Sequence, residues 1–414
     1  MDTDDTALRP LTRLQQAVIA LAMVSMGAGM TINFVVVSPL ARDAGLTELQ
    51  VAGILTFSAA LYAFTIPIWG RIADKFGRKR VMIFSLCAMA TTNMAFLFGL
   101  DAALTGVVTG TMSFLLLAFI RLWFGILAPG LQPAAMATMT DATTSQNRAA
   151  GLGMLGAAMG LGSIIGPAGA TVLSQFGALA PLWGTIVFCY IVAIILAFTL
   201  PPTRASRTSL QRPKPLSVFD KRVMPHLLFL FAYFVGVGMI QQTLAWFIQD
   251  RYGFIDTASQ SAREQAVFFT GLIFTFMSVA LLVVQFGYVT PKKPDPRRML
   301  PVGLGLVAVG YTLADNVQPF WALCIAFTIV GIGAALAVPA ANAMGSLSVP
   351  RPSQAGAAAL LAMAPPLGFI FGPLVGAILY AIDHRYPLYA SALLMAVLCI
   401  YAALVTAKRP LNMH

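Results

Sequence analysis

Hydrophobic residues occur along almost the whole chain in runs of roughly 20, and short polar segments separate these runs. An apolar stretch of about 20 residues is what a helix needs to cross the hydrocarbon core of a bilayer. The first run is too long for a cleavable signal sequence and has no A-x-A exit, so we expect it to remain in the mature protein. The pattern predicts twelve membrane-spanning helices, at about 15–39, 49–69, 81–100, 107–133, 150–173, 180–200, 226–249, 265–288, 299–314, 318–345, 355–381 and 387–407.

The longest polar stretch lies near the middle of the chain, at residues 201–224, and is rich in Pro, Arg and Ser. This composition is typical of a flexible linker between folded units. We therefore expect an all-α membrane protein in which residues 1–200 form an N-terminal six-helix bundle. Residues 225–414 would form a second, pseudo-symmetric six-helix bundle, and residues 201–224 a cytoplasmic linker between the two.

Several residues recur at a fixed distance of half the chain, which is the mark of an internal repeat. The matches at Gly and Pro carry this inference, since Ala is too common here to count. A duplication of a six-span unit follows, as in transporters that are built from two repeated halves. The residues Gly125, Pro133, Gly166 and Pro167 reappear 206 positions later as Gly331, Pro339, Gly372 and Pro373.

Composition agrees with a membrane protein, and charge distribution fixes its predicted orientation. The chain is 58% hydrophobic and only 10% charged, with a mean hydropathy of +0.82. A sequence pI near 9.8 would also suit a nucleic-acid-binding protein. However, 21 of the 26 Lys and Arg residues fall in segments that are cytoplasmic if both termini are inside. This is the positive-inside rule, so the basic charge indicates topology and not a nucleic-acid partner.

The segment 70–80 carries six charged residues within eleven positions, between two segments apolar enough to span a bilayer. A membrane helix cannot hold that density of charge, so this segment is expected to be a tight aqueous loop. It resembles the G-x-x-x-D-R/K-x-G-R-R/K loop that major facilitator transporters carry between their second and third helices. The fixed positions of that loop fall here on Gly70, Asp74, Gly77 and Arg78.

The resemblance implies a conformational latch at the inner ends of the spans. We expect Gly70 to let the end of span 2 approach a neighbouring helix closely. Asp74 is suited to face the N-terminus of span 11, where the helix dipole favours an anion. Arg78 would pair with an acid at the inner end of span 4, which is Asp141 in this chain. The alternative is a basic anchor loop with no switching role.

Arg121 is a charged residue about midway along the predicted span 107–133. A charge at this depth costs at least about 2.5–3.5 kcal/mol, so a charge without a function should be lost. Its R-x-x-x-G setting resembles the span-4 arginine of proton-coupled drug exporters, which implies a fixed positive charge that faces a central cavity. The alternative is a structural arginine that hydrogen-bonds to helix carbonyls.

Span 5 is rich in glycine and closes on Gly-Pro, as in the antiporter signature of the same family. Small residues permit close helix packing, here expected against span 8, and Gly-Pro bends or loosens a helix. A role in packing alone is the alternative, because span 11 has a similar sequence. The residues concerned are Gly162, Gly166 and Pro167, with Gly372 and Pro373 in span 11.

Polar side chains within predicted spans are candidates for lining a substrate cavity. Gln242 and Trp246 fall on one face of span 7 at i, i+4 spacing, and Gln241 lies beside them. Asn33 in span 1 and Asn342 in span 10 add isolated amides. Hydrogen bonding to neighbouring helices is the alternative role for these groups.

Acidic residues are few, and none of the 15 Asp and Glu residues falls at the middle of a predicted span. Many drug/proton antiporters carry an acid in span 1, where this chain has Thr31 and Asn33. A site with Arg121 and no central acid should favour a neutral, zwitterionic or anionic substrate. A drug-like compound or a siderophore-like metabolite would fit.

Taken together, these motifs resemble the twelve-span drug/proton antiporter branch of the major facilitator superfamily. The resemblance implies export of a small molecule from the cytoplasm by alternating access, with protons as the coupling ion. We expect a monomer in a bacterial inner membrane, since the sequence has no N-x-S/T sequon and no large soluble extension, with both termini cytoplasmic by the positive-inside rule. No catalytic group, cofactor or metal is expected, since the chain has no nucleophile–base or metal-ligand constellation. The alternatives are a uniporter or proton symporter for an organic anion and, more remotely, a membrane sensor that does not transport.

Overall fold

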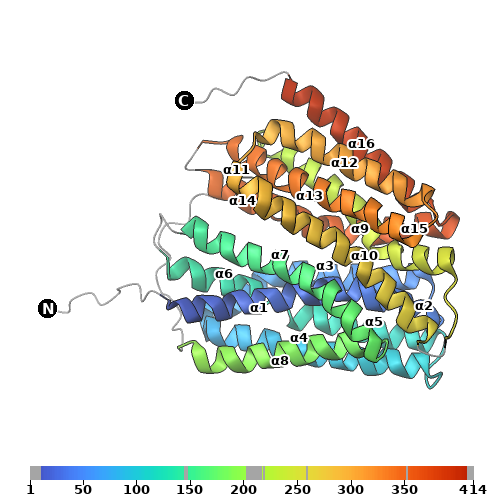
Figure 1. Ribbon diagram of the computed structural model, residues 1–414. Coiled ribbons are helices and arrows are strands. Elements are labelled where there is room, and N and C mark those ends of the chain that lie inside the picture. The colour runs from blue at the N-terminus through green and yellow to red at the C-terminus, as the bar shows by residue number, and fades with distance from the viewer. Residues whose placement is uncertain are drawn as a thin grey trace. The chain divides into compact units, whose positions relative to one another are not determined.

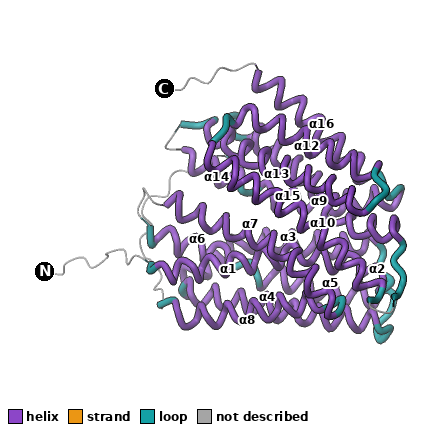
Figure 2. The backbone as a smooth tube through the Cα atoms, in the orientation of Figure 1, coloured by secondary structure: helices purple, strands orange, loops and turns teal. Residues whose placement is uncertain are grey.

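The computed structural model describes residues 11–143, 148–201, 217, 220–257, 260–350 and 353–407. Helices joined by short loops make up this part of the chain, which contains no strand (Figures 1 and 2). Most of the predicted linker at 201–224 lies outside the described residues, as do both chain ends, at 1–10 and 408–414.

The first half of the chain follows the predicted spans closely. Several helices are longer than the predicted apolar runs and include polar residues at their ends. The elements are α1 (Arg13–Ile32), the π-helical segment η1 (Asn33–Val37), α2 (Ser38–Asp43), α3 (Glu48–Phe76), α4 (Arg78–Leu104), α5 (Thr111–Leu127), α6 (Leu131–Asp141), α7 (Arg148–Leu173), the short 3-10 segment η2 (Ser174–Phe176) and α8 (Ala180–Thr199).

Long helices also make up the second half of the chain. Its predicted span 11 is divided into two helices, α14 and α15, by a short turn at residues 362–363. The elements are α9 (Met224–Tyr252), α10 (Ala262–Val284), the π-helical segment η3 (Gln285–Val289), α11 (Thr290–Lys292), α12 (Pro296–Asn316), α13 (Phe320–Leu347), α14 (Gln354–Leu361), α15 (Ala364–Ile382) and α16 (Tyr386–Ala407).

Eleven helical segments of the described chain are long and apolar enough to cross a membrane. The remaining long helix, α12, coincides with the predicted span 299–314. Its apolar stretch is short, because Arg297 and Arg298 stand at its start and Asp315 near its end. The all-α membrane fold predicted from the sequence is thereby confirmed.

The chain divides into two compact units. Unit 1 comprises Met1–Leu46, Phe57–Thr208 and Asp256–Phe268, and unit 2 comprises Thr47–Thr56, Ser209–Ile255 and Phe269–His414. Each unit is described by itself below.

In unit 1, α1 and α7 approach each other closely through glycines. A Cβ atom at Gly162 would overlap the carbonyl oxygen of Val24, and one at Gly166 would lie 2.8 Å from that of Ala28. Gly162 and Gly166 therefore face α1 of the same unit, and the expected packing of span 5 against span 8 stays a prediction. Pro167 lies inside α7, which continues as an α-helix to Leu173.

Unit 2 contains the equivalent contact between α9 and α15. A Cβ atom at Gly372 would lie 2.7 Å from the carbonyl oxygen of Val235 and 2.8 Å from the Cα atom of Gly238. Gly372 is the repeat counterpart of Gly166, so the two glycines make the same kind of contact in their own units. Pro373 follows inside α15, which remains helical to Ile382.

A second pair of repeat counterparts behaves in the same way. A Cβ atom at Gly125 would lie 2.6 Å from the carbonyl oxygen of Ser58 in α3. One at Gly331, 206 positions later, would overlap the carbonyl oxygen of Met277 in α10. The glycines that recur in the sequence thus mark places where helix backbones come close within each unit.

These contacts predict that Gly162→Ala destabilises the protein whereas Gly160→Ala does not. Nothing lies within 4 Å of the position of a Cβ atom at Gly160, while Gly162 faces the backbone of α1. Alanine at Gly162 should cost about 1–3 kcal/mol through overpacking, and at Gly160 it should be neutral or favourable to the helix. Thermal unfolding of the purified protein in detergent measures the difference, and equal melting temperatures for the two variants would contradict the packing described.

Candidate functional site

Arg121 lies within α5, and packing against α3 fixes the position of its backbone. Ser58 Oγ in α3 donates a hydrogen bond of 2.8 Å to the carbonyl oxygen of Arg121. One turn later, Gly125 permits close contact with the same helix, and its carbonyl oxygen accepts a hydrogen bond of 2.8 Å from Thr65 Oγ1. The Arg121 residue is only 2% exposed, so its charge lies in the interior of unit 1.

Two neutral amides hold the Arg121 guanidinium. Its Nη2 donates to Asn33 Oδ1, and its Nη1 donates to Asn93 Oδ1 over 3.4 Å. The Nε atom is buried and has no hydrogen-bond partner. The predicted alternative, a structural arginine bonded to helix carbonyls, does not match this arrangement, because both partners are side chains of other helices.

Asn33 is oriented for this contact by its own helix. Its Nδ2 donates a hydrogen bond of 2.6 Å to the carbonyl oxygen of Gly29, which leaves Oδ1 to accept from Arg121. Asn33 is also the first residue of the π-helical segment η1. Short π-helical segments inside α-helices are frequent at functional sites.

Aromatic rings provide the remaining stabilisation of the buried charge. The guanidinium carbon of Arg121 lies 4.0 Å from the centroid of the Phe96 ring and 5.4 Å from that of Phe124. Such cation–π contacts are worth about 2 kcal/mol or more when the cation is desolvated. Among the described residues, no carboxylate is within ion-pair distance of Arg121. The site is therefore a buried cation compensated only by dipoles and aromatic faces.

The predicted latch loop is a sharp turn between α3 and α4. Gly77 has a φ of +96°, a conformation that residues with a side chain rarely adopt, which explains the glycine. The role expected for Gly70 is wrong. A Cβ atom there would meet only Pro133 Cβ, at 4.0 Å, so this position has room for a side chain and forms no close helix contact.

Arg78, the first residue of α4, is at the centre of the charged contacts in this loop. Its Nη1 pairs with the Asp141 carboxylate at the end of α6, and also donates a hydrogen bond of 2.6 Å to the carbonyl oxygen of Ala137. Its Nη2 lies 3.6 Å from the carboxylate of Asp74 in α3. The expected partners Arg78 and Asp141 are thus in contact, while the predicted contact of Asp74 with the start of span 11 stays a prediction.

The polar residues of span 7 belong to unit 2. Gln242 and Trp246 are completely buried, so neither faces an open cavity in this structure. The Trp246 ring packs against Tyr380 with 5.6 Å between centroids, and the Tyr380 hydroxyl donates to the Asp250 carboxylate. Gln241 is half-buried. Cavity lining by these side chains remains a prediction.

Asn342, in α13 of unit 2, is exposed. Its Nδ2 donates a hydrogen bond of 3.0 Å to the carbonyl oxygen of Val338 in the same helix. Of the predicted substrate residues, the structure brings Arg121 and Asn33 into direct contact.

Sequence reasoning missed Asn93, Phe96 and Phe124 as partners of Arg121. Asn93 was detectable, because it is an isolated amide within the predicted span 81–100, the same signal that singled out Asn33. The two phenylalanines carried no such signal among the 28 of the chain. Asp250 was also missed as an acid in the last turn of α9.

Almost the whole length of the chain matches a known protein family. The model of the Major Facilitator Superfamily matches residues 18–294 and 266–413. The chain belongs to this superfamily. It is therefore a multi-pass membrane transporter, and the substrates of this superfamily are small molecules.

Curated members of the superfamily are similar over most of their length. Multidrug resistance protein 1 of Bacillus subtilis (strain 168) is 26% identical over 363 residues, which cover 85% of this chain and 87% of that protein. The multi-drug resistance efflux pump PmrA of Streptococcus pneumoniae serotype 4 is 25% identical over 382 residues, with coverage of 87% and 88%.

Solved structures of superfamily members share the fold. A mutant form of the nucleoside transporter NupG has a TM-score of 0.69 at 14% identity, and the match covers 95% of this chain and 99% of that chain. A bacterial homolog of the human lysosomal transporter Spinster, in an inward-facing and unoccupied conformation, has a TM-score of 0.67 at 18% identity, with coverage of 95% and 96%.

The geometry around Arg121 predicts strong energetic coupling between Arg121 and Asn33. Asn33→Leu removes an acceptor and leaves a buried cationic donor unpaired, which should cost about 1–3 kcal/mol of folding stability. In an Arg121→Met background the same change should cost little, because the donor is gone. Thermal or denaturant unfolding of the four proteins of this cycle measures the coupling.

Asn342→Leu is the matched control, because this exposed amide bonds only to its own helix and should change stability by less than about 0.5 kcal/mol. An equal cost of Asn33→Leu in both backgrounds would show that the contact with Arg121 carries no energy.

Proposed function

We propose that this transporter exports small organic or amphipathic molecules from the cytoplasm by alternating access, in exchange for protons. Superfamily membership supports transport, and the names of relatives that match over most of their length support export. These relatives include Multidrug resistance protein 1, the efflux pump PmrA and the class H tetracycline resistance protein of Pasteurella multocida. The protein would lie in a bacterial inner membrane as a monomer. The distribution of Lys and Arg predicts that both termini are cytoplasmic.

The buried charge of Arg121 is the observation that carries the substrate class. A guanidinium with only neutral partners creates a positive potential in a medium of low dielectric constant, where electrostatic interactions are strong. A permanently cationic molecule would be repelled there, whereas a carboxylate, phosphate or polarised carbonyl oxygen would be attracted. We therefore propose a neutral, zwitterionic or anionic substrate.

Within this proposal, the side chains around Arg121 have distinct tasks. Asn33 and Asn93 orient the guanidinium, and Phe96 and Phe124 cover it and keep water away. The unpartnered Nε is a donor that could bind a substrate oxygen. Gln241, Gln242, Trp246 and Asn342 remain proposed substrate contacts from unit 2.

The contacts of Arg78 suit a latch that opens and closes during transport. Both acids that face Arg78, Asp74 and Asp141, have side chains that are 48% exposed. Ion pairs in contact with water are worth about 0–1 kcal/mol, which is small enough to break in each cycle. A fully buried pair would cost several kcal/mol to separate and would hold one conformation.

Transport measurements on Arg121 variants test the proposed site. A panel of toxic compounds applied to a deletion strain first identifies a compound that the protein exports. Export of that compound should then fall about 10- to 100-fold in Arg121→Ala, the loss expected when one or two charged hydrogen bonds are removed. Arg121→Lys should retain partial activity, because it keeps the charge but loses the fork geometry.

Arg13→Ala is the control for this experiment, since Arg13 is an exposed arginine at the start of α1. Membrane abundance is measured for every variant. Undiminished export in both Arg121 variants would refute the role assigned to this residue.

Proteoliposomes test the coupling. Export against a concentration gradient should require an inward-directed proton gradient and should stop when an ionophore collapses it. Accumulation of the compound in the same direction as the protons would identify a symporter. Equilibration that ignores the gradient would identify a uniporter; both results would exclude antiport. A symporter or uniporter for an organic anion is the alternative, because no described carboxylate pairs with Arg121.

A further inference from the structure

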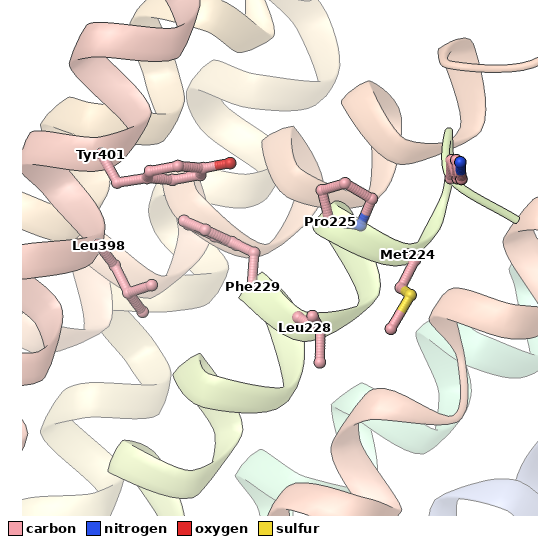
Figure 3. Close-up of a pocket in the computed structure, with 7 residues that line it drawn as sticks. Met224, Pro225, Leu228, Phe229, Leu398 and Tyr401 are labelled. Atoms are coloured by element: carbon pink, nitrogen blue, oxygen red, sulfur yellow. The ribbon is translucent and has the colours of Figure 1, made fainter. Parts of the chain in front are cut away.

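The first turns of α9 and the last turns of α16 enclose a groove in unit 2 (Figure 3). Its volume is about 470 Å³, within the range of roughly 300–1,000 Å³ that is typical of ligand sites. The groove is separate from the surroundings of Arg121, which belong to unit 1. The residues that line it are Lys221, Met224, Pro225, Leu228, Phe229, Leu398 and Tyr401.

The walls of this groove are almost entirely apolar. Phe229 and Leu398 are 8% and 9% exposed and form the floor, while Leu228 and Tyr401 are 53% and 50% exposed and form the rim. Both α9 and α16 have the length and composition of membrane spans. An exposed apolar rim on such helices contacts hydrocarbon, so the groove can admit an acyl chain.

One end of the groove carries a positive charge. Lys221 lies three positions before the first residue of α9 and forms no ion pair with a described residue. The neighbouring Arg222 differs, because Asp220 binds its guanidinium through two contacts, Nε–Oδ1 at 3.0 Å and Nη2–Oδ2 at 2.8 Å. The Lys221 ammonium is therefore the charge that remains for an external anion.

The two ends of the groove lie at different depths. Lys221 precedes the helix, on the side that the basic residues predict to be cytoplasmic. Tyr401 lies within α16, which continues to Ala407, so it is about 9 Å along the helix from that end. A cationic mouth at the surface thus leads into an apolar slot, and this polarity matches a molecule with an anionic head and a hydrocarbon tail.

We propose that this groove binds an anionic phospholipid of the inner leaflet. The lipid phosphate pairs with Lys221, and one acyl chain lies along Pro225, Leu228 and Leu398. Basic pockets between membrane helices on the cytoplasmic side bind anionic headgroups in this way. The inference does not depend on the substrate or on the direction of transport.

Native mass spectrometry of the full-length protein tests the proposal. The protein is equilibrated with micelles that contain phosphatidylglycerol and phosphatidylcholine of identical acyl chains in equal amounts, and the retained lipids are counted. Wild-type protein should retain phosphatidylglycerol in preference, by about fivefold, the ratio equivalent to the roughly 1 kcal/mol of one lysine near an anionic surface. Lys221→Ala should lose this preference.

Lys292→Ala is the matched control, because it removes an exposed lysine on the same predicted side of the membrane but away from the groove. It should retain phosphatidylglycerol as the wild type does. Leu228→Trp adds bulk at the exposed rim and should reduce retention of both lipids. Lys292 and Leu228 are both exposed, so the fold should tolerate Lys292→Ala and Leu228→Trp.

Three results would overturn the proposal. The first is equal retention of the two lipids by the wild-type protein, and the second is an equal loss of preference in Lys221→Ala and Lys292→Ala. The third is a dimer of the protein that is observed in the mass spectrum without bound lipid and is lost in Leu228→Trp. That result would assign the groove to a second copy of the protein.

Discussion

The structure depends on one constraint: inside the membrane, where water is absent, every backbone amide and carbonyl needs a hydrogen-bond partner within the protein. In the hydrocarbon phase a backbone amide or carbonyl that lacks a partner costs several kcal/mol, so helices that satisfy their own backbone groups are required. Because lipid tails are as apolar as leucine, burial of apolar surface cannot hold such helices together, and close backbone contact takes its place. Gly162 against Val24 and Gly372 against Gly238 are contacts of this kind.

The same constraint explains the arrangement around Arg121. A cation in this environment needs acceptors, and the structure provides two amide oxygens, from Asn33 and Asn93, with aromatic rings on other sides. A carboxylate would neutralise the charge and lock the pair, since buried ion pairs are costly to separate. Amides hold the guanidinium in place and leave its charge available to a visiting anion or carbonyl group.

The sequence was sufficient for the fold, because apolar runs of membrane length have a single structural interpretation. It also singled out Arg121 and Asn33, since polar groups are conspicuous in such runs. It was not sufficient to find Phe96, because aromatic residues are common in every span. It did not show that Gly162 faces α1, since glycine spacing shows that a helix approaches but not which one. For Gly70, the glycine fitted a motif, yet the backbone there has room for a side chain.

The π-helical segment at Asn33–Val37 has a consequence for the whole of span 1. A turn of this kind accommodates one additional residue, which rotates everything beyond it by about 100° relative to an uninterrupted α-helix. The residues of α1 that face α7 recur at α-helical spacing, and this spacing does not continue into α2. A helical wheel with one constant angle per residue across residue 33 therefore places the residues of α2 on the wrong face of the helix.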